Sequence, residues 1–293
     1  MSSKTRDFLL LHFIVFAWGW TAVLGKIITL PALQMIWIRV IMALVGIVGY
    51  AFFKKKSFFI SKENIFKLLL IGLLVGLHWI CFYCAVKVSN VSVTLACFST
   101  GTLFTAFIEP LFYKRRILFY EILFGAIVIG ALLLIFNLET KYFWGIVLGV
   151  GAAFTSSLMA VVNSIMSRKN IDAEIISSYE MVGALASISF FVLLLEPQTA
   201  TLFNVSLHDW IYLLLFIVFC TIIPFIIGIV ILKNVSPYTL SLTLNLETIY
   251  GILFAYFIFG NSEEMSLTFY IGAAVILAVV CADAYMKSRK QSY

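Results

Sequence analysis

A glutamate, Glu247, lies near the middle of an apolar run that extends from residue 236 to residue 259. A run of this length spans a bilayer as a helix, so its centre is expected near the hydrocarbon midplane. An ionised residue at that depth costs about 2.5–3.5 kcal/mol on insertion scales unless it faces a cavity, a partner or the interior of a bundle. Glu247 is therefore predicted to belong to a functional site. A protonated glutamate bonded to a neighbouring helix is the alternative.

Other residues share the expected helical face of Glu247. At helical spacing, Thr243 and Tyr250 lie beside it, and Gly251 and Phe254 continue the face. Hydroxyl groups and an aromatic ring around a carboxylate suit a polar small molecule. Three roles for Glu247 remain open at this point: it couples a proton, binds an amine of the solute, or orients its neighbours.

Several other expected spans also contain polar or aromatic residues. We predict additional substrate contacts for Trp18, Trp20, His78, Tyr83, Ser99, Thr102 and Asn163. Coupling or gating is a candidate role for Arg39 and Glu180 as well as for Glu247. Packing or snorkelling is an alternative for Arg39, and structural hydrogen bonding is one for His78. For Glu180, close to a helix end, solvation or pairing is the favoured interpretation.

The elements that must position these residues are membrane helices. The chain is 63% hydrophobic and 12% charged, whereas soluble domains have about 25% charged residues. Apolar runs of about 20 residues predict an all-α integral membrane protein with ten transmembrane helices. The expected spans are 7–29, 31–53, 65–88, 91–113, 118–137, 143–167, 173–195, 208–233, 236–259 and 265–286.

The net charge of the chain is +6, and its lysines and arginines are distributed unevenly between the two sides of the expected spans. With the N-terminus placed in the cytoplasm, only Lys26, Lys87 and Lys141 fall outside, Arg39 lies inside a span, and all the others are cytoplasmic. This is the asymmetry of the positive-inside rule. We therefore expect a multi-pass protein of the cell inner (plasma) membrane with both termini in the cytoplasm, and no nucleic-acid partner.

An internal repeat divides the chain into residues 1–139 and 140–293. The segment 125–131 of the fifth expected span resembles 272–278 of the tenth, and nearly the same shift pairs Lys87 with Lys233. Because each half has five spans, the second half must start on the opposite side of the membrane. Inverted repeats of this kind favour alternating access around a cavity at the midplane between the halves.

With its two five-helix repeats and the short motifs Trp18-Gly19 and Leu246-Glu247, the chain resembles the EamA-type transporters of the drug/metabolite transporter superfamily. The resemblance rests on the two five-helix repeats and on short motifs: Trp18-Gly19 in the first span, Arg39 in the second, 85–87 (Ala-Val-Lys) in the third and Leu246-Glu247 in the ninth. The family's proline after this glutamate is absent, since Thr248 follows it. The Gly-Glu that usually closes each repeat is also absent, with Lys114-Arg115 in the first repeat and Gly260-Asn261 in the second.

The resemblance implies a membrane exporter of amino acids or related small metabolites. A flippase of lipid-linked or amphipathic substrates is the alternative. An intramembrane enzyme is disfavoured, because the chain contains three histidines, no His-Glu-x-x-His and no Gly-x-Ser-x-Gly. We expect no cofactor. His78, Cys81 and Cys84 could contact a metal only with a further ligand, so no metal site is predicted. The expected partners are a small-molecule substrate and the lipid bilayer, with proton coupling as an option.

Overall fold

The computed structural model describes residues 3–114, 116–117, 119–138, 140–195 and 204–290, and all the regular structure in these ranges is helical. The first half consists of α1 (Ser3–Gly19), α2 (Thr21–Ile27), α3 (Ala32–Phe53), α4 (Lys62–Val88), α5 (Val91–Phe98), α6 (Gly101–Tyr113) and α7 (Phe119–Leu138). The second half consists of η1 (Thr140–Tyr142), α8 (Phe143–Ser167), α9 (Ala173–Leu195), α10 (Leu207–Ile217), η3 (Val218–Ile222), α11 (Ile223–Ile231), α12 (Pro237–Thr243), α13 (Asn245–Phe259), η4 (Gly260–Glu263) and α14 (Leu267–Lys290).

Eight of the helical segments are long and apolar enough to cross a membrane. They correspond to eight of the ten expected spans. The other two expected spans correspond to α7 and α14, in which shorter apolar helices, Ile122–Ala131 and Leu267–Val279, are found. The all-helical membrane fold is therefore confirmed, and the number ten stays a prediction.

Four expected spans are interrupted rather than continuous. The first is broken between α1 and α2 at Trp20, the fourth between α5 and α6, and the ninth between α12 and α13 at Leu244. The eighth contains the π-helical turn η3 just before Pro224. Proline has no backbone N–H to continue the helical hydrogen bonds, so a local rearrangement is expected there. Backbone hydrogen bonds still cross the breaks, for example from Leu24 N to the carbonyl of Trp20 at 2.8 Å and from Glu247 N to that of Leu244 at 2.9 Å.

Side-chain caps fix where several helices begin. Ser61, Asn90, Ser206 and Ser236 accept hydrogen bonds from the backbone N–H three residues later, at the starts of α4, α5, α10 and α12. Such caps satisfy N–H groups that have no partner within the helix. The short connections between spans therefore carry their own helix start signals.

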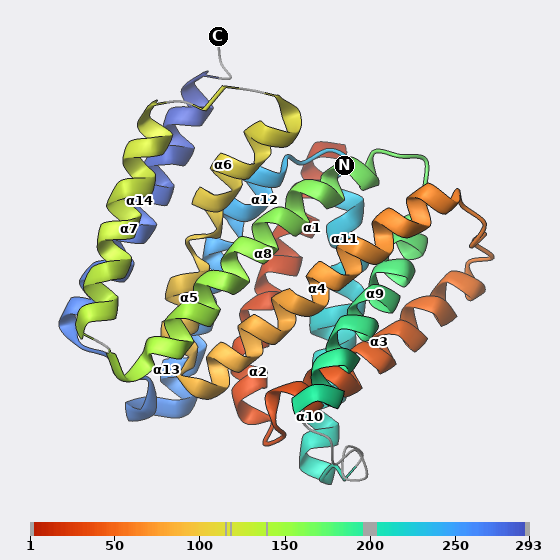
Figure 1. Ribbon diagram of the computed structural model, residues 1–293, viewed down its shortest axis with the longest axis horizontal. Coiled ribbons are helices and arrows are strands. Elements are labelled where there is room, and N and C mark those ends of the chain that lie inside the picture. Colours follow the sequence, from red (N-terminus) through yellow and green to blue (C-terminus); the bar gives the residue numbers. More distant parts are fainter. Residues whose placement is uncertain (1–2, 115, 118, 139, 196–203, 291–293) are drawn as a thin grey trace.

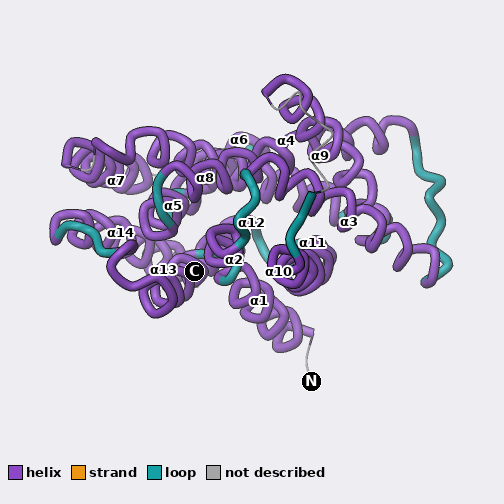
Figure 2. The backbone as a smooth tube through the Cα atoms, turned by 90° about the horizontal axis from the view of Figure 1, so that it is seen from below, coloured by secondary structure: helices purple, strands orange, loops and turns teal. Residues whose placement is uncertain are grey.

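The two halves interleave instead of forming separate bodies. Helix α4 packs on α8 and α9, α3 packs on α9, and α1 packs on α11 and α13. Figure 2 shows α7, α8 and α4 on one side of the bundle and α14, α13 and α1 on the other. Helices α7 and α14 lie side by side at one edge (Figure 1). A cavity at the centre is consequently lined by helices of both halves.

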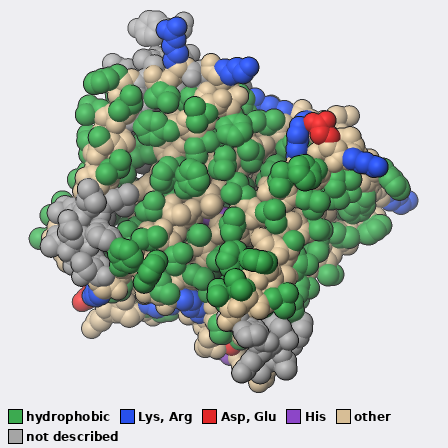
Figure 3. All heavy atoms as spheres, in the orientation of Figure 1, with side chains coloured by type: hydrophobic (Ala, Val, Ile, Leu, Met, Phe, Trp, Pro, Cys, Tyr) green, Lys and Arg blue, Asp and Glu red, His purple; other side chains and the backbone are tan. Residues whose placement is uncertain are grey.

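The outer surface is apolar around its middle. Figure 3 shows hydrophobic side chains covering the centre of the visible face, with Lys and Arg toward its margins. Large side chains such as Phe66, Phe190 and Leu253 are exposed. A soluble monomer rarely exposes such an extensive apolar surface, whereas a bilayer solvates it.

Glycine permits the closest helix contact, between α4 and α9. A Cβ on Gly72 would overlap the carbonyl oxygen of Glu180 and lie 2.8 Å from the Cα of Gly183. A Cβ on Gly183 would in turn overlap the carbonyl oxygen of Leu69. The backbones therefore touch, as at the small-residue interfaces of membrane helices.

Gly72→Ala should reduce stability by about 1–3 kcal/mol, because the added methyl group must push two backbones apart. Gly49→Ala on α3 is the matched control, since nothing lies within 4 Å of its Cβ position. That control should be neutral or stabilising by up to about 1 kcal/mol, as alanine favours helix more than glycine does. Thermal unfolding in detergent micelles measures both. Equal melting temperatures for the two variants would contradict the close packing of α4 and α9.

Candidate functional site

A cavity lies at the centre of the bundle between the two halves. Its volume is about 100 Å³, several times the ~10–15 Å³ that admits one water molecule. Six of the residues that the sequence singled out line it: Trp18, Arg39, His78, Tyr83, Asn163 and Glu247. They come from α1, α3, α4, α8 and α13. Apolar side chains such as Phe98, Met159 and Leu244 complete much of the wall, as is usual for small-molecule sites.

Glu247 occupies the first turn of α13, immediately after the break at Leu244. The side chain is buried, with 4% of its surface exposed. Among the residues that the structure describes, none forms a hydrogen bond or an ion pair with its carboxylate. The positive end of the α13 dipole favours a negative charge at this position. The break between α12 and α13 thus places an unpaired carboxyl group on the cavity wall.

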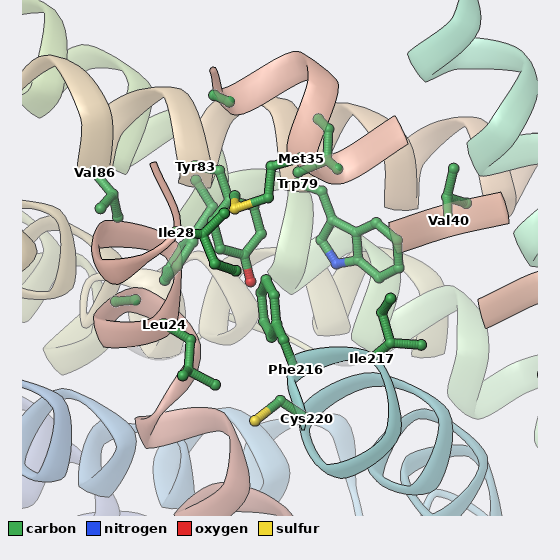
Figure 4. Close-up of a cluster of buried hydrophobic side chains, with 14 of the residues drawn as sticks. Leu24, Ile28, Met35, Val40, Trp79, Tyr83, Val86, Phe216, Ile217 and Cys220 are labelled. Atoms are coloured by element: carbon green, nitrogen blue, oxygen red, sulfur yellow. The ribbon is translucent and has the colours of Figure 1, made fainter. Parts of the chain in front are cut away.

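Arg39 lies within α3 and is 2% exposed, so it does not snorkel to the surface. Its Nε donates to Thr221 Oγ1 at 2.8 Å. The guanidinium carbon lies 4.0 Å from the ring centroid of Trp79 and 4.2 Å from that of Phe216. Figure 4 shows these two rings with Tyr83, converging from α4 and α10. Desolvated cation–π contacts of this kind are worth about 2 kcal/mol.

One donor of Arg39 is left over. Its Nη1 is buried and has no hydrogen-bond partner among the described residues. Thr221, which binds Nε, lies in the π-helical turn and donates its own hydroxyl to the carbonyl of Phe216 at 3.0 Å. The turn before Pro224 therefore orients the guanidinium, and π-helical turns are frequent at functional sites.

The two charged groups face one environment without pairing. No ion pair joins Arg39 to Glu247 within the described part of the chain. Tyr83 and Cys220 are each close enough to both groups to interact with them electrostatically. The cavity therefore presents a guanidinium group and a carboxyl group that do not pair with each other. A solute that carries both an anionic and a cationic group would complement this arrangement.

His78 and Asn163 contribute polar atoms from two further helices. His78 Nδ1 lies 3.0 Å from the carbonyl oxygen of Ala152, and its ring packs on Phe82 and Phe98. Asn163 Nδ2 donates to Glu180 Oε2 at 3.3 Å. Glu180 is fully buried behind Asn163. Of the two interpretations favoured for Glu180, solvation is therefore wrong, because tertiary packing buries its side chain completely; its hydrogen-bond partner is the amide of Asn163.

Trp20 and Tyr250 lie outside the cavity. Trp20 stacks on Phe254, with ring centroids 4.3 Å apart, and Tyr250 packs against Gly19 and Phe16. These rings fill the contact between α1 and α13. Their assignment to the substrate stays a prediction, and the contacts seen here are between helices.

Ser99, Thr102 and Thr243 surround the helix breaks instead of the cavity. Thr102 Oγ1 donates to the carbonyl of Ser241 at 3.0 Å and accepts from Asn245 Nδ2 at 2.7 Å. Ser99 and Thr243 donate to carbonyl groups of their own helical segments. The α-helical pattern that placed Thr243 beside Glu247 is interrupted at Leu244, where Glu247 N bonds the carbonyl three residues earlier at 2.9 Å.

The sequence did not identify Trp79, Cys220 and Thr221 as part of this cavity, although all three line it. Pro224 was the available signal for Thr221, because a proline within a span indicates a local distortion about one turn earlier. Nothing comparable distinguished Trp79 from the other aromatic residues. Across the described ranges, no three His, Cys, Asp or Glu side chains are grouped as they would be around a metal ion.

A polar network ties the halves at the bundle end that carries residues 28–31, 89–90 and 260–266, here called the latched end. Glu263 is buried and accepts from Val91 N at 3.1 Å, Ser92 N at 2.9 Å and Ser92 Oγ at 2.8 Å. It also pairs with Lys26 at 2.7 Å. Asp209 accepts from the backbone and hydroxyl of Thr29, both at 2.7 Å. This end is therefore closed by contacts between the repeats.

Comparisons with known proteins agree with this architecture. Twenty-eight chains of solved structures match. One crystal structure covers 97% of this chain and 98% of its own, with a TM-score of 0.69 and 12% sequence identity. At that identity the likeness shows the fold alone. No curated protein matches the chain in sequence.

The family comparison is more specific. The model of the EamA-like transporter family matches twice, over residues 7–137 and 143–282. The two matches coincide with the two halves of the bundle and together cover nearly the whole chain. This protein therefore belongs to the EamA-like transporter family and is a multi-pass membrane protein.

Proposed function

We propose that this protein exports amino acids or related small zwitterionic metabolites by alternating access. The observation that carries the proposal is that Arg39 and Glu247, both buried, line the same cavity and form no ion pair with any residue that the structure describes. The ammonium group of the solute binds the carboxylate of Glu247, and its carboxylate binds the free Nη1 of Arg39. Aromatic side chains of the wall contact the remainder of the solute.

The solutes that the cavity favours depend on which charged groups are left without a partner when each solute is bound. A buried charge without a partner is strongly unfavourable, whereas a buried charge in a well-formed pair is close to neutral. A zwitterion compensates both protein groups at once and is itself compensated by them. A singly charged amine or acid leaves one of the two groups without a partner. The site therefore favours solutes that carry both charges.

The helix contacts support inverted repeats of five spans. Exchanging the halves maps α1 and α2 onto α8, and α4 onto α10 and α11. The contact of α4 with α8 then corresponds to that of α11 with α1, and both occur. The contacts of α5 and α6 with α8 correspond to those of α12 and α13 with α1, which also occur. The shift that pairs Lys87 with Lys233 also superposes α5 on α12.

The orientation follows from the charges in the loops. With both termini in the cytoplasm, the latched end faces outward. The cavity extends in the other direction, to Leu232 and Leu240, which flank the loop on the cytoplasmic side. The structure then represents a state closed to the outside. Rocking of the halves would open the latched end and release the solute outward.

Transport by purified protein in liposomes tests the proposal. Labelled amino acids should exchange saturably, and Glu247→Gln should weaken apparent affinity because a charge-assisted hydrogen bond is lost. The loss is about 1.5–3 kcal/mol, or roughly tenfold to a hundredfold. Glu264→Gln, an exposed acid near the latched end, is the matched control and should transport normally. Transport of lipid-linked substrates alone would favour a flippase, and an unimpaired Glu247→Gln protein would remove Glu247 from the site.

The latched end gives an independent prediction. Glu263→Gln weakens the pair with Lys26 and the bonds to α5, so the outward-open state should become more populated. Cys220 lies on the cavity wall and reports this opening when the other four cysteines are replaced by serine. A membrane-impermeant maleimide added outside should label it faster, by about tenfold for a loss of ~1.4 kcal/mol. An unchanged rate in the folded variant, equal to that of Glu264→Gln, would contradict the role of the latch.

A further inference from the structure

A second buried acid lies directly behind the cavity. Glu180 on α9 has no exposed surface. Its Oε2 accepts from Asn163 Nδ2 at 3.3 Å, while its Oε1 has no partner among the described residues. Asn163 lines the cavity, so one side chain separates Glu180 from the solute. The carboxyl group of Glu180 takes no part in the hydrogen bonds of the latched end.

Within the described ranges, no charged group pairs with Glu180. Of the helices packed against α9, neither α8 nor α11 contains a charged residue. On α3 the only charged residue, Arg39, is held by Thr221. On α4, Lys62 is exposed at the helix start, where Glu63 and Lys67 pair with each other. Lys87 bonds the carbonyl of Ile28 at the other end, and His78 faces Ala152. Among the side chains that the structure describes, Asn163 is the hydrogen-bond partner of the Glu180 carboxyl group.

The unpartnered atoms of the pair are complementary. Besides Glu180 Oε1, the buried Oδ1 of Asn163 also has no partner in the described structure. A carboxylic acid and an amide form a ring of two hydrogen bonds, N–H to carboxyl oxygen and O–H to amide oxygen. The first of these bonds is present. One proton on Glu180 Oε1 would supply the second and satisfy both orphaned oxygens, which otherwise carry the cost of burial without a partner.

We propose that Glu180 and Asn163 form a proton-binding site that couples proton movement to the solute cavity. With the proton on Oε1, Glu180 donates to Asn163 Oδ1 and the amide is held in the closed ring. When the proton leaves, a carboxylate and an amide oxygen face each other and repel, so the amide of Asn163 must turn. Because Asn163 belongs to the cavity wall, this turn changes the hydrogen-bonding group that the solute meets.

The coupling role rests on the proposed transport function, but the protonation of Glu180 does not. Glu180→Gln is the informative variant, since glutamine mimics the protonated acid and closes the same ring with its amide N–H. It should fold normally. Counterflow exchange of a labelled amino acid should continue, whereas the response of net transport to an imposed pH gradient should be lost. A full gradient response in Glu180→Gln would overturn the coupling.

Infrared spectroscopy of the purified protein tests protonation without any substrate. In a Glu247→Gln background, which removes another buried acid that lines the cavity, a carboxylic-acid C=O band should titrate with pH, and adding Glu180→Gln should abolish it. Asn163→Leu should shift the band because the bond to the amide oxygen is lost. Glu264→Gln is the control and should leave it in place. These spectra need no substrate. A failure of amino-acid transport and a failure of Glu180 protonation can therefore be told apart.

Two infrared results would overturn the proton site. An unchanged spectrum in Glu180→Gln would show that this acid does not carry the proton. The second is a sodium effect. If the band is present in a buffer whose only cation is choline and is lost when sodium replaces choline, the site binds a metal cation. Such a cation could use the unpartnered Ser177 Oγ, one turn before Glu180, as a third oxygen.

Discussion

The separation of two buried charges is the constraint on which the rest of the structure depends. Arg39 is fixed by Thr221 and by the rings of Trp79 and Phe216, while Glu247 lies at the start of a half-helix without a partner. Direct pairing would remove the cost of burying both. It would also leave nothing for a solute to bind. The helix break before Glu247 and the aromatic rings around Arg39 position the two groups separately in the cavity lining.

In the proposed alternating-access cycle, the interleaved repeats would let the site face either side. The two halves meet in two kinds of contact: the tight glycine packing of α4 on α9 and the polar network at the latched end. The glycine contact is close packing of two backbones, and separating the helices would lose its van der Waals contacts, so this contact suits a pivot. The second consists of an ion pair and a few hydrogen bonds that water can replace. The bundle thus has a firm contact and a releasable one, as rocking of two halves requires.

Much of the fold could be predicted from the sequence, because bilayer thickness fixes helix length and apolar runs reveal it. Eight of the ten expected spans correspond to helices that are long and apolar enough to cross a membrane, and the family model matches the chain twice. The site could be predicted only in part. Trp18, Arg39, His78, Tyr83, Asn163 and Glu247 come together, whereas Thr243 and Ser99 lie at helix breaks that a regular period of 3.6 residues cannot anticipate. The burial of Glu180 depends on tertiary packing, and distance from a helix end gave no indication of it.

The central claim is that Glu247 and Arg39 bind the two ends of one solute. Calorimetric binding of an amino acid, its decarboxylated amine and its deaminated acid tests this most directly. We expect Glu247→Gln to weaken binding of the amino acid and the amine but not of the acid. We expect Arg39→Lys, which loses the planar fork but keeps the charge, to weaken binding of the amino acid and the acid but not of the amine. Equal weakening of all three ligands by both variants would contradict the claim.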